Sequence, residues 1–546
     1  MNAWQNQLYF GDNLNILREY LPSESVDLIY LDPPFNSKAT YNVLFAEKSG
    51  DASVAQITAF DDTWHWGREA EEAFHDLITT GPVKLSHLIA AFRSFLGQND
   101  MMAYIVMMAI RLVELHRVLK PTGSIYLHCD PTASHYIKLL LDSIFEVKNF
   151  RNEIIWKRSQ PKAHAVTRFS RSHDTIFFYA KSEKTKFAQQ YSRYKEDYVK
   201  KFYRHIEPET GRIFQLGDLT NPNRNRPNLT YEFPPGSGIT RVWRWTQEKM
   251  MKAWKDGMIV IPEQGGVPRL KRYFNELKGT LLTDIWVDIE HLHGSNKEWL
   301  KYPTQKPEAL LYRIIKTSSN EGDVVLDPFC GCGTATVVAE RLKRRWIGID
   351  ITHLAITLIK KRLRDTFGES LSDFRVIGAP TDWTSAAALA EHNRHQFEWW
   401  ALSLVDARPA QDKRKGPDTG VDGYIYFFDD NTEKPKKIVV QVKSGAVSVA
   451  QVRDLKGVLE REKAALGAFL TLKEPSRQML AEAAAAGYYE PEQLNGLKFP
   501  RLQVLTIADL LAGKQLEHPK FGAATFKSAP KQRKGPVPED TQKNLL

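Results

Sequence analysis

A short acidic and aromatic motif, Asp32-Pro33-Pro34-Phe35, directly follows the mainly apolar run Val26–Leu31. A run of this length and composition is typical of a buried parallel strand. The sequence therefore predicts a carboxylate, a backbone held rigid by two prolines and a flat ring together at the end of a strand. Such a group offers hydrogen-bond acceptors and a stacking face. For this motif taken alone, a Pro-rich turn that merely ends a strand is the alternative.

A second motif, Pro328-Phe-Cys-Gly331-Cys-Gly-Thr334, follows the predicted strand Asp323–Asp327 and opens a predicted helix over 335–342. Glycines in such a loop let the backbone approach a nucleotide, and the amino terminus of the helix offers free N–H groups. The next predicted strand ends in Asp350, 19 residues after Gly331 (350 − 331). An acid at about 20 residues from the first glycine can hold ribose hydroxyls. Together these features predict a nucleotide-type cofactor.

Two alternatives apply to this loop. A dehydrogenase fingerprint, GxGxxG, would need a third glycine at position 336, where the sequence has Thr336. The pair Cys330 and Cys332 could suggest a metal, but two cysteines without nearby His or Cys partners make a poor zinc site. We expect both to be small side chains that fill space beside the glycines.

The elements that position these motifs belong to more than one domain, because 546 residues exceed what one hydrophobic core supports. Alternating apolar runs and helical patterns predict an α/β domain over 1–182 that resumes over 301–382, interrupted by a basic and aromatic segment at 183–300. A smaller α/β domain is predicted over 395–513 and a disordered basic tail over 519–546.

Composition limits the class of protein. A net charge of +10 fits a soluble protein that meets a polyanion. Three cysteines give no disulfide framework and favour the cytoplasm. The first residues lack the pattern of a leader peptide, and no apolar run is long enough to span a membrane.

The motifs and their order resemble a known family. The Asp32 motif is similar to the catalytic motif of amino-group DNA methyltransferases, and the glycine loop to their S-adenosylmethionine loop. Because the catalytic motif comes first, the chain resembles the β-class, a permuted form of the Rossmann-like methyltransferase fold. Within the family, the chain resembles the modification subunits of type III systems and their stand-alone relatives. The resemblance covers about residues 5–380, and further similar segments are Gly11-Asp12, Leu119–Gly123, His173–Lys181 and Tyr302–Pro307.

The resemblance implies a role for each residue of the first motif. The Asp32 carboxylate and the Pro33 carbonyl, held in place with Pro34, would accept hydrogen bonds from an exocyclic amine and make its nitrogen a better nucleophile. Phe35 would stack on a base extruded from the duplex. In this family an aspartate at the first position favours N6 of adenine, whereas N4-cytosine enzymes more often have serine there.

The resemblance also implies a cofactor site and a DNA-binding region. Asp12 would lie near the adenine of S-adenosylmethionine, Asp350 on its ribose, and Thr304 and Lys306 near its methionine end. The segment 183–300 would be the target-recognition region for double-stranded DNA. The expected cofactor-binding set is Asp12, Thr304, Lys306, Asp327, Phe329, Gly331, Gly333, Thr334 and Asp350.

The C-terminal segment carries a weaker constellation. Asp422 begins one predicted strand, and alternation places Gln441 and Lys443 on one face of its antiparallel neighbour. The segment resembles the Mrr-type PD-(D/E)xK restriction endonuclease-like core, in which Asp422, Gln441 and Lys443 would be catalytic. Asp422 and Gln441, with Glu398 on the preceding helix, would hold Mg²⁺. Chance occurrence of such a short pattern is the alternative.

Three functions follow from these patterns. The first is a bifunctional restriction–modification enzyme that methylates adenine and cuts unmarked DNA. The second is a methyltransferase whose C-terminal domain only binds DNA or a partner. The third is a non-catalytic DNA-binding protein, which the intact motifs disfavour. The sequence leaves open whether the protein forms a homodimer and whether it works with a restriction or translocating partner.

Overall fold

The computed structural model describes residues 4–34, 40–46, 52–61, 64–159, 167, 169–261, 266–293, 295–300, 302, 304–410, 420–428, 435–491 and 496–519. The chain divides into two compact units. Of the described residues, those up to Ala188 and from Asp284 onward form the first, and Gln189–Thr283 form the second. Apart from Pro519, the predicted tail lies outside the described residues. No helix among the described residues combines the length and apolar character needed to cross a membrane.

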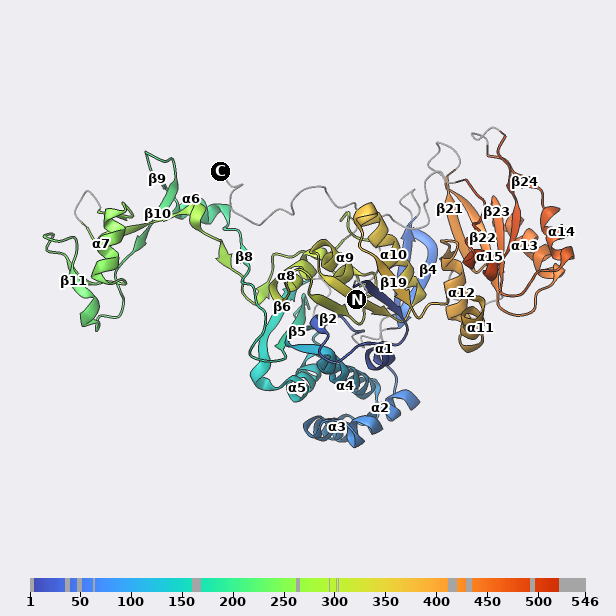
Figure 1. Ribbon diagram of the computed structural model, residues 1–546, viewed down its shortest axis with the longest axis horizontal. Helices are drawn as coiled ribbons and strands as arrows, with labels where there is room; N and C mark the ends of the chain where they lie inside the picture. Colours follow the sequence, from blue (N-terminus) through green and yellow to red (C-terminus); the bar gives the residue numbers. More distant parts are fainter. Residues whose placement is uncertain are drawn as a thin grey trace. The chain divides into compact units, whose positions relative to one another are not determined.

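A large, mostly parallel sheet forms the centre of the first unit (Figure 1). Its strand β7 is antiparallel to both of its neighbours. Strands β2 and β17 are direct neighbours although about three hundred residues separate them, so their carboxyl ends lie at the same edge. In spatial order the strands are β16 (Ile285–Trp286), β6 (Phe150–Lys157), β7 (His173–Ala180), β5 (Leu119–Cys129), β2 (Val26–Leu31), β17 (Val324–Asp327), β18 (Arg345–Asp350), β1 (Asn6–Phe10) and β19 (Phe374–Ile377).

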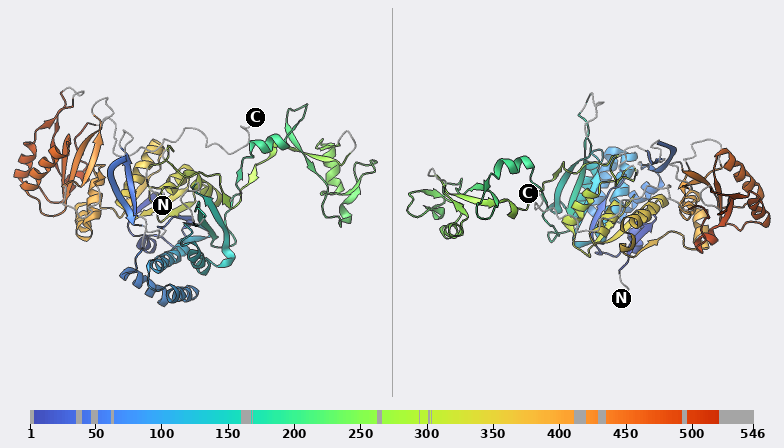
Figure 2. Two further views of the ribbon diagram at one scale, coloured as in Figure 1. Left: turned by 180° about the vertical axis from the view of Figure 1, so that it is seen from behind. Right: turned by 90° about the horizontal axis from the view of Figure 1, so that it is seen from above.

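Helices cover both faces of this sheet (Figures 1 and 2). All six residues of β2 are buried, which explains why the sequence there is a continuous rather than an alternating apolar run. A separate antiparallel pair, β3 (Thr40–Ala46) and β4 (Ala52–Asp61), follows β2 in the chain. One face carries α1 (Asn13–Tyr20), α2 (Arg68–Thr79), α3 (Val83–Leu96), α4 (Asp100–Val118) and α5 (Ser134–Phe145), and the other α8 (Glu308–Ser318), α9 (Thr334–Arg341) and α10 (His353–Phe367).

The buried aspartate of β2, Asp27, ties three elements together at the edge opposite the carboxyl ends. Its carboxylate accepts hydrogen bonds from Lys120 Nζ (2.6 Å), Lys186 Nζ (2.9 Å) and the Val324 backbone N–H (3.0 Å). Burial raises the pKa of Asp27, but these partners outweigh it and lower that pKa below its usual value. This polar residue within an apolar strand therefore fixes β2 against β5 and β17.

Helix α4 passes directly into strand β5. The helix ends at Val118 and the strand begins at Leu119. Leu119 pairs with Val26, and the register then shifts before Ser124 pairs with Leu28. Pro121 lies in this irregular stretch, where a residue without a backbone N–H is tolerated.

The second unit lies within the predicted insertion at 183–300 and has a small core of its own. Phe233 and Trp243 are fully buried there, with Leu219, Met250 and Ile259 around them. Its strands are β8 (Tyr191–Ser192) with β15 (Thr280–Leu281), β11 (Thr230–Glu232) with β12 (Thr240–Val242), and the sheet of β13 (Ile259–Val260), β14 (Arg269–Tyr273), β10 (Ile213–Asp218) and β9 (His205–Ile206); its helices are α6 (Glu196–Phe202) and α7 (Gln247–Lys255).

The C-terminal part of the first unit has its own sheet and cores. Ala386, before the predicted start at 395, also belongs to one of these cores. This part of the chain also contains a shorter antiparallel pair, β24 (Tyr488–Tyr489) and β25 (Phe499–Pro500). The sheet contains β20 (Arg408–Pro409), β21 (Gly423–Phe427), β22 (Lys436–Lys443), β23 (Leu466–Thr471) and β26 (Leu502–Thr506), and the helices are α11 (Trp383–His392), α12 (Arg394–Ser403), α13 (Val449–Arg461), α14 (Arg477–Ala484) and α15 (Ile507–Leu511).

Candidate active site

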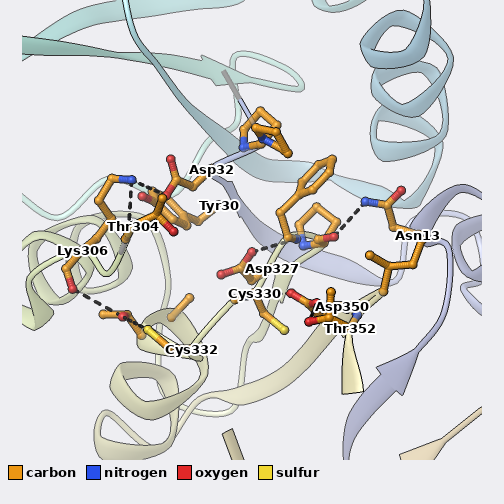
Figure 3. Close-up of a pocket in the computed structure, with 18 of the residues that line it drawn as sticks. Asn13, Tyr30, Asp32, Thr304, Lys306, Asp327, Cys330, Cys332, Asp350 and Thr352 are labelled. Atoms are coloured by element: carbon orange, nitrogen blue, oxygen red, sulfur yellow. Dashed lines mark hydrogen bonds and ion pairs between the residues drawn. The ribbon is translucent and has the colours of Figure 1, made fainter. Parts of the chain in front are cut away.

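A cavity opens where β2, β17 and β18 reach their carboxyl ends (Figure 3). It encloses about 1090 Å³, including space open to solvent. Asp32, Asp327 and Asp350, which follow or end these three strands, all line it. Ligand sites of open α/β sheets lie at this edge.

Asp32 has one paired and one unpaired carboxylate oxygen. Lys306 Nζ donates to Oδ2. The other oxygen, Oδ1, is buried and has no hydrogen-bond partner. A buried acceptor without a partner is costly, so this oxygen is free to accept a donor from a ligand in the cavity. The sequence had placed Lys306 only near the cofactor, and its ion pair with Asp32 was not expected.

Asp327 and Asp350 have unusual protonation properties. Burial raises the pKa of Asp327 well above its usual value, and the nearby carboxylates of Asp32 and Asp350 add to this effect. Burial also raises the pKa of Asp350 to about 6, although hydrogen bonds oppose it. These bonds come from the N–H groups of Gly331 (2.9 Å) and Thr352 (2.9 Å). Clustered acids with raised pKa values are typical of functional sites.

The glycine loop has a backbone that other residues would strain. Gly331 and Gly333 have φ values of +50° and +75°. A Cβ at Gly333 would lie 2.8 Å from Ile359 Cγ1, so this position has no space for a side chain. Arg362 holds the end of the loop by donating to the Cys332 carbonyl (3.0 Å) and to Thr334 Oγ1 (3.1 Å).

The opposite wall of the cavity is joined to this loop by hydrogen bonds. Asp12 caps α1 by accepting from Leu14 N–H (2.9 Å) and pairs with Arg111 Nη2 (2.7 Å). Arg111 Nε also donates to Asn13 Oδ1 (2.6 Å), and Asn13 Nδ2 donates to the Pro328 carbonyl (2.8 Å). The network therefore links Asp12 to the glycine loop.

The structure brings most of the predicted residues to this one cavity. Of the described ones, Gly333 does not line it, and Phe35 lies outside the described residues. The individual roles remain predictions. The predicted residues that line the cavity are Asp12, Asp32, Pro33, Pro34, Thr304, Lys306, Asp327, Phe329, Gly331, Thr334 and Asp350.

Several lining residues were missed by the sequence predictions. Asn13 stands directly beside a recognised motif and Tyr302 begins one, so these motifs could have indicated both residues. Tyr30 alternates with Asp32 along β2 and could have been placed on the same face. Arg111 and Trp64 come from segments without a motif, and nothing in the sequence indicates them.

Both cysteines of the glycine loop are buried, with free thiols. Burial raises the pKa of both Cys330 and Cys332, which keeps the thiols protonated. In the described part of the chain no group of three or more His, Cys, Asp or Glu side chains could hold a metal ion.

The predicted nuclease residues lie in the C-terminal domain. Asp422 is buried, and its Oδ2 accepts the Val442 backbone N–H at 2.7 Å. Val440 and Val442 share a core with Phe397 of α12, so alternation places Gln441 on the other face of β22. The catalytic and Mg²⁺-binding roles of Asp422, Gln441, Lys443 and Glu398 stay predictions.

Comparison with known proteins identifies the family. Residues 26–361, more than half of the chain, match the family model described as DNA methylase. The chain belongs to the DNA methylase family. This match contains Asp32, the glycine loop and Asp350. Residues 394–505 match a second model, described as NACHT-associated inactive restriction endonuclease 1. These matches do not support the Mrr-type assignment, but they do support a restriction endonuclease-like domain.

Two curated relatives are similar over the methylase part. The type II methyltransferase M.EcaI of Enterobacter cloacae is 27% identical over 363 residues, which cover 65% of this chain and 69% of the relative. The Mod subunit of the type III restriction-modification enzyme StyLTI of Salmonella typhimurium is 26% identical over 342 residues. That match covers 60% of this chain, which spans about half (49%) of the relative's length.

Solved structures of DNA methyltransferases also match. The complex of M1.HpyAVI with SAM is 15% identical with a TM-score of 0.29, and covers 65% of this chain and 99% of its own. The cytosine-N4-specific PvuII DNA methyltransferase is 15% identical with a TM-score of 0.30, and covers 66% of this chain and 86% of its own.

Proposed function

We propose that this DNA methylase transfers a methyl group from S-adenosylmethionine to N6 of adenine at a specific site in duplex DNA. The observation that carries the proposal is the unpartnered Oδ1 of Asp32, in a cavity shared with the glycine loop and Asp350. An exocyclic amine has N–H donors that such an acceptor can bind.

Asp32 and its neighbours prepare the amine for attack. Lys306 holds Oδ2 and thereby orients the carboxylate, while Oδ1 accepts one amine N–H. The carbonyl of Pro33, fixed by the proline that follows, accepts the other. Both interactions localise the nitrogen lone pair, and they strengthen as the nitrogen becomes positive. The residues also hold the amine close to the methyl donor, which removes much of the entropic barrier.

The cavity fits the proposed cofactor. Asp350 ends β18 with acceptor oxygens at the position where ribose hydroxyls are held, and Asp12 and Thr304 lie on its walls. Gly331, which lines the cavity, has a left-handed backbone and places no side chain there. S-Adenosylmethionine, when bound, supplies an electrophilic methyl group on a sulfonium.

Product analysis tests this proposal. The full-length protein is incubated with S-adenosylmethionine carrying a labelled methyl group and unmethylated plasmid DNA, and the DNA is digested to nucleosides. We expect the label in N6-methyladenine, and none with Asp32→Ala. Label in N4-methylcytosine would refute the choice of adenine, and no label in any nucleoside would refute methyl transfer to DNA. Sequencing the product then gives the target site.

We further propose that the second unit recognises the target. Residues 189–283 contain 17 Lys and Arg and 10 Asp and Glu, so this segment has a net charge of +7, most of the +10 of the whole chain. Its loop 222–228 is exposed. The Asn223 N–H donates to Asn221 Oδ1 (3.0 Å), and the Asn225 N–H to Asn223 Oδ1 (3.1 Å). These turns order the backbone of a loop that presents Arg224 and Arg226, and arginine is well suited to guanine edges.

Paired substitutions test this assignment. Arg224→Ala with Arg226→Ala should relax the sequence preference of methylation, by about 1–3 kcal/mol for each lost base contact. Lys252→Ala with Lys255→Ala, on α7 of the same unit, removes the same charge from another surface and should affect all sequences alike. An unchanged preference in the arginine variant would contradict the proposal.

For the C-terminal domain we propose a non-cleaving module that binds DNA or a partner. The match to an inactive endonuclease family supports this over the predicted Mg²⁺-dependent nuclease. Unmethylated plasmid incubated with the full-length protein and Mg²⁺ should stay intact. Cleavage that Lys443→Ala abolishes would contradict this and restore the bifunctional restriction–modification enzyme.

A further inference from the structure

A continuous chain of polar side chains runs through the sheet behind Asp32. Tyr30, two residues before Asp32 on β2, contacts His128 Nδ1 with its hydroxyl at 3.1 Å. His128 Nε2 contacts Asp174 Oδ2 at 3.1 Å, and Asp174 Oδ1 lies 3.0 Å from Arg158 Nε. These connected side chains lead from β2 to β5 and β7, and the last of them is a partly exposed arginine after β6. Nothing in the proposed function accounts for it.

Burying these polar side chains costs folding free energy unless they are paired. Tyr30, His128 and Asp174 are exposed by 2%, 0% and 1%. The ring of Trp156 packs edge-on against His128, with ring centroids 5.7 Å apart. Three polar side chains in such surroundings require complete pairing, and apolar residues would serve a purely structural core better.

The hydrogen bonds of the chain have a definite direction. Burial raises the pKa of Asp174, but the hydrogen bond from His128 and the charge of Arg158 lower it below the usual value, so Asp174 is an ionised acceptor. His128 Nε2 therefore carries a hydrogen atom and donates a hydrogen bond to Asp174 Oδ2. In this tautomer Nδ1 has a lone pair, which accepts a hydrogen bond from the Tyr30 hydroxyl. Burial raises the pKa of Tyr30 well above its usual value, which keeps this hydroxyl protonated.

One end of the chain reaches the active site. Tyr30 lines the cavity together with Asp32, as Figure 3 shows. Its hydroxyl oxygen still has lone pairs after donating to His128. Asp32 is the other base nearby, but Lys306 already occupies its Oδ2, and protonating Asp32 would leave that ammonium without its partner charge.

We propose that Tyr30 and His128 form a relay that removes the proton from the target amine during methyl transfer. The proposal rests on the proposed transfer to an exocyclic amine. As the amine nitrogen bonds to the methyl carbon, the carbon–sulfur bond breaks and its electron pair stays on sulfur. The positively charged nitrogen passes one proton to the Tyr30 oxygen, and the Tyr30 hydroxyl proton moves to His128 Nδ1. The imidazolium is balanced by Asp174, and it returns its proton through Tyr30 to water after product release.

Single-turnover kinetics test the relay. Full-length wild type, Tyr30→Phe and His128→Asn are each saturated with S-adenosylmethionine and mixed with target DNA, in H₂O and in D₂O. A wild type that uses the relay should transfer the methyl group more slowly in D₂O. Both variants should be about 100-fold slower, which is within the usual contribution of a positioned base, and should lose the isotope effect. Cofactor dissociation constants, measured by calorimetry, should stay near wild type.

A matched control separates the relay from a role in the fold. Tyr126 on β5 is equally buried, and its hydroxyl contacts Ser318 Oγ at 2.7 Å, away from the cavity lining. Tyr126→Phe should therefore keep the wild-type rate and the isotope effect. Wild-type rates in Tyr30→Phe or His128→Asn, no isotope effect in wild type, or loss of cofactor binding in either variant would overturn the relay. Absence of methyl transfer by wild type would instead refute the proposed function.

Discussion

Two sheets of this chain each carry an aspartate near a strand end, but the aspartates are used differently. Asp32 faces a cavity, pairs with Lys306 and keeps one buried oxygen without a partner. Asp422 lies in the smaller sheet, where its Oδ2 binds the Val442 backbone N–H. The first arrangement leaves a hydrogen-bond acceptor for a ligand, whereas the second uses the carboxylate to hold two strands together.

The two domains also differ in the pKa values of their acids. Next to Asp32, burial raises the pKa of Asp327 and Asp350. In the C-terminal domain partners lower the pKa of Glu462 and Asp509 although burial opposes them. The raised values come mainly from the burial of these carboxylates, which costs stability, and acids of this kind are typical of functional sites. The local environment of an acid therefore indicates its role better than the motif around it.

The largest expected effect is on catalysis at Asp32. Asp32→Ala removes the acceptor that strengthens as the amine becomes positive, so methyl transfer should fall by about 10³-fold. The cofactor dissociation constant should stay near wild type, since the proposed ribose contact at Asp350 is intact. Transfer of labelled methyl groups and equilibrium dialysis measure the two quantities. A variant that transfers methyl groups at the wild-type rate would show that Asp32, like Asp422, has a structural rather than a catalytic role.

Two glycines with the same backbone conformation sharpen the comparison. Gly333 in the loop and Gly487 in the C-terminal domain have φ values of +75° and +79°. No atom lies within 4 Å of a Cβ at Gly487, so Gly487→Ala should cost only the backbone strain, about 1 kcal/mol. Gly333→Ala adds contacts with Ile359 and should cost about 3 kcal/mol of unfolding free energy and weaken cofactor binding. Urea unfolding and calorimetry measure both, and equal costs would contradict the close packing of the loop.

Asp422→Ala should show the opposite pattern to Asp32→Ala. It leaves the Val442 N–H buried without an acceptor, so the unfolding free energy of the C-terminal domain should fall by about 2 kcal/mol. Methyl transfer should be unchanged, because the cavity is in another domain. Thermal unfolding and the transfer assay test this prediction. Unchanged stability would mean that Asp422 is kept for a ligand rather than for the fold.

The sequence predicted the methylase site well because its motifs are local and parallel strands bring their ends to one edge. Asp32, Gly331 and Asp350 could be expected in one cavity on that basis. Contacts that depend on side-chain direction could not be predicted. Lys306 reaches Asp32 rather than only the cofactor end, and Tyr30 joins His128 across two strands. In the C-terminal domain, the segments of Asp422 and Gln441 were correctly predicted to be neighbouring strands. That α12 packs on the face of β22 opposite Gln441 could not be predicted.

The smallest expected effect is the pH dependence of cofactor binding, which arises from Asp350. Burial raises the pKa of this carboxyl to about 6 in the free protein. A ribose hydroxyl binds the ionised form, so protons compete with the cofactor below that pKa, and affinity should fall as the pH drops. The loss should be about tenfold between pH 7 and pH 5, or about 1.4 kcal/mol. Calorimetric titration at several pH values measures it, and Asp350→Asn, which cannot ionise, should bind more weakly with no such slope. A wild-type affinity that is flat across this range would place Asp350 with the structurally paired acids of the C-terminal domain, and the ribose contact would then have to be made elsewhere in the cavity.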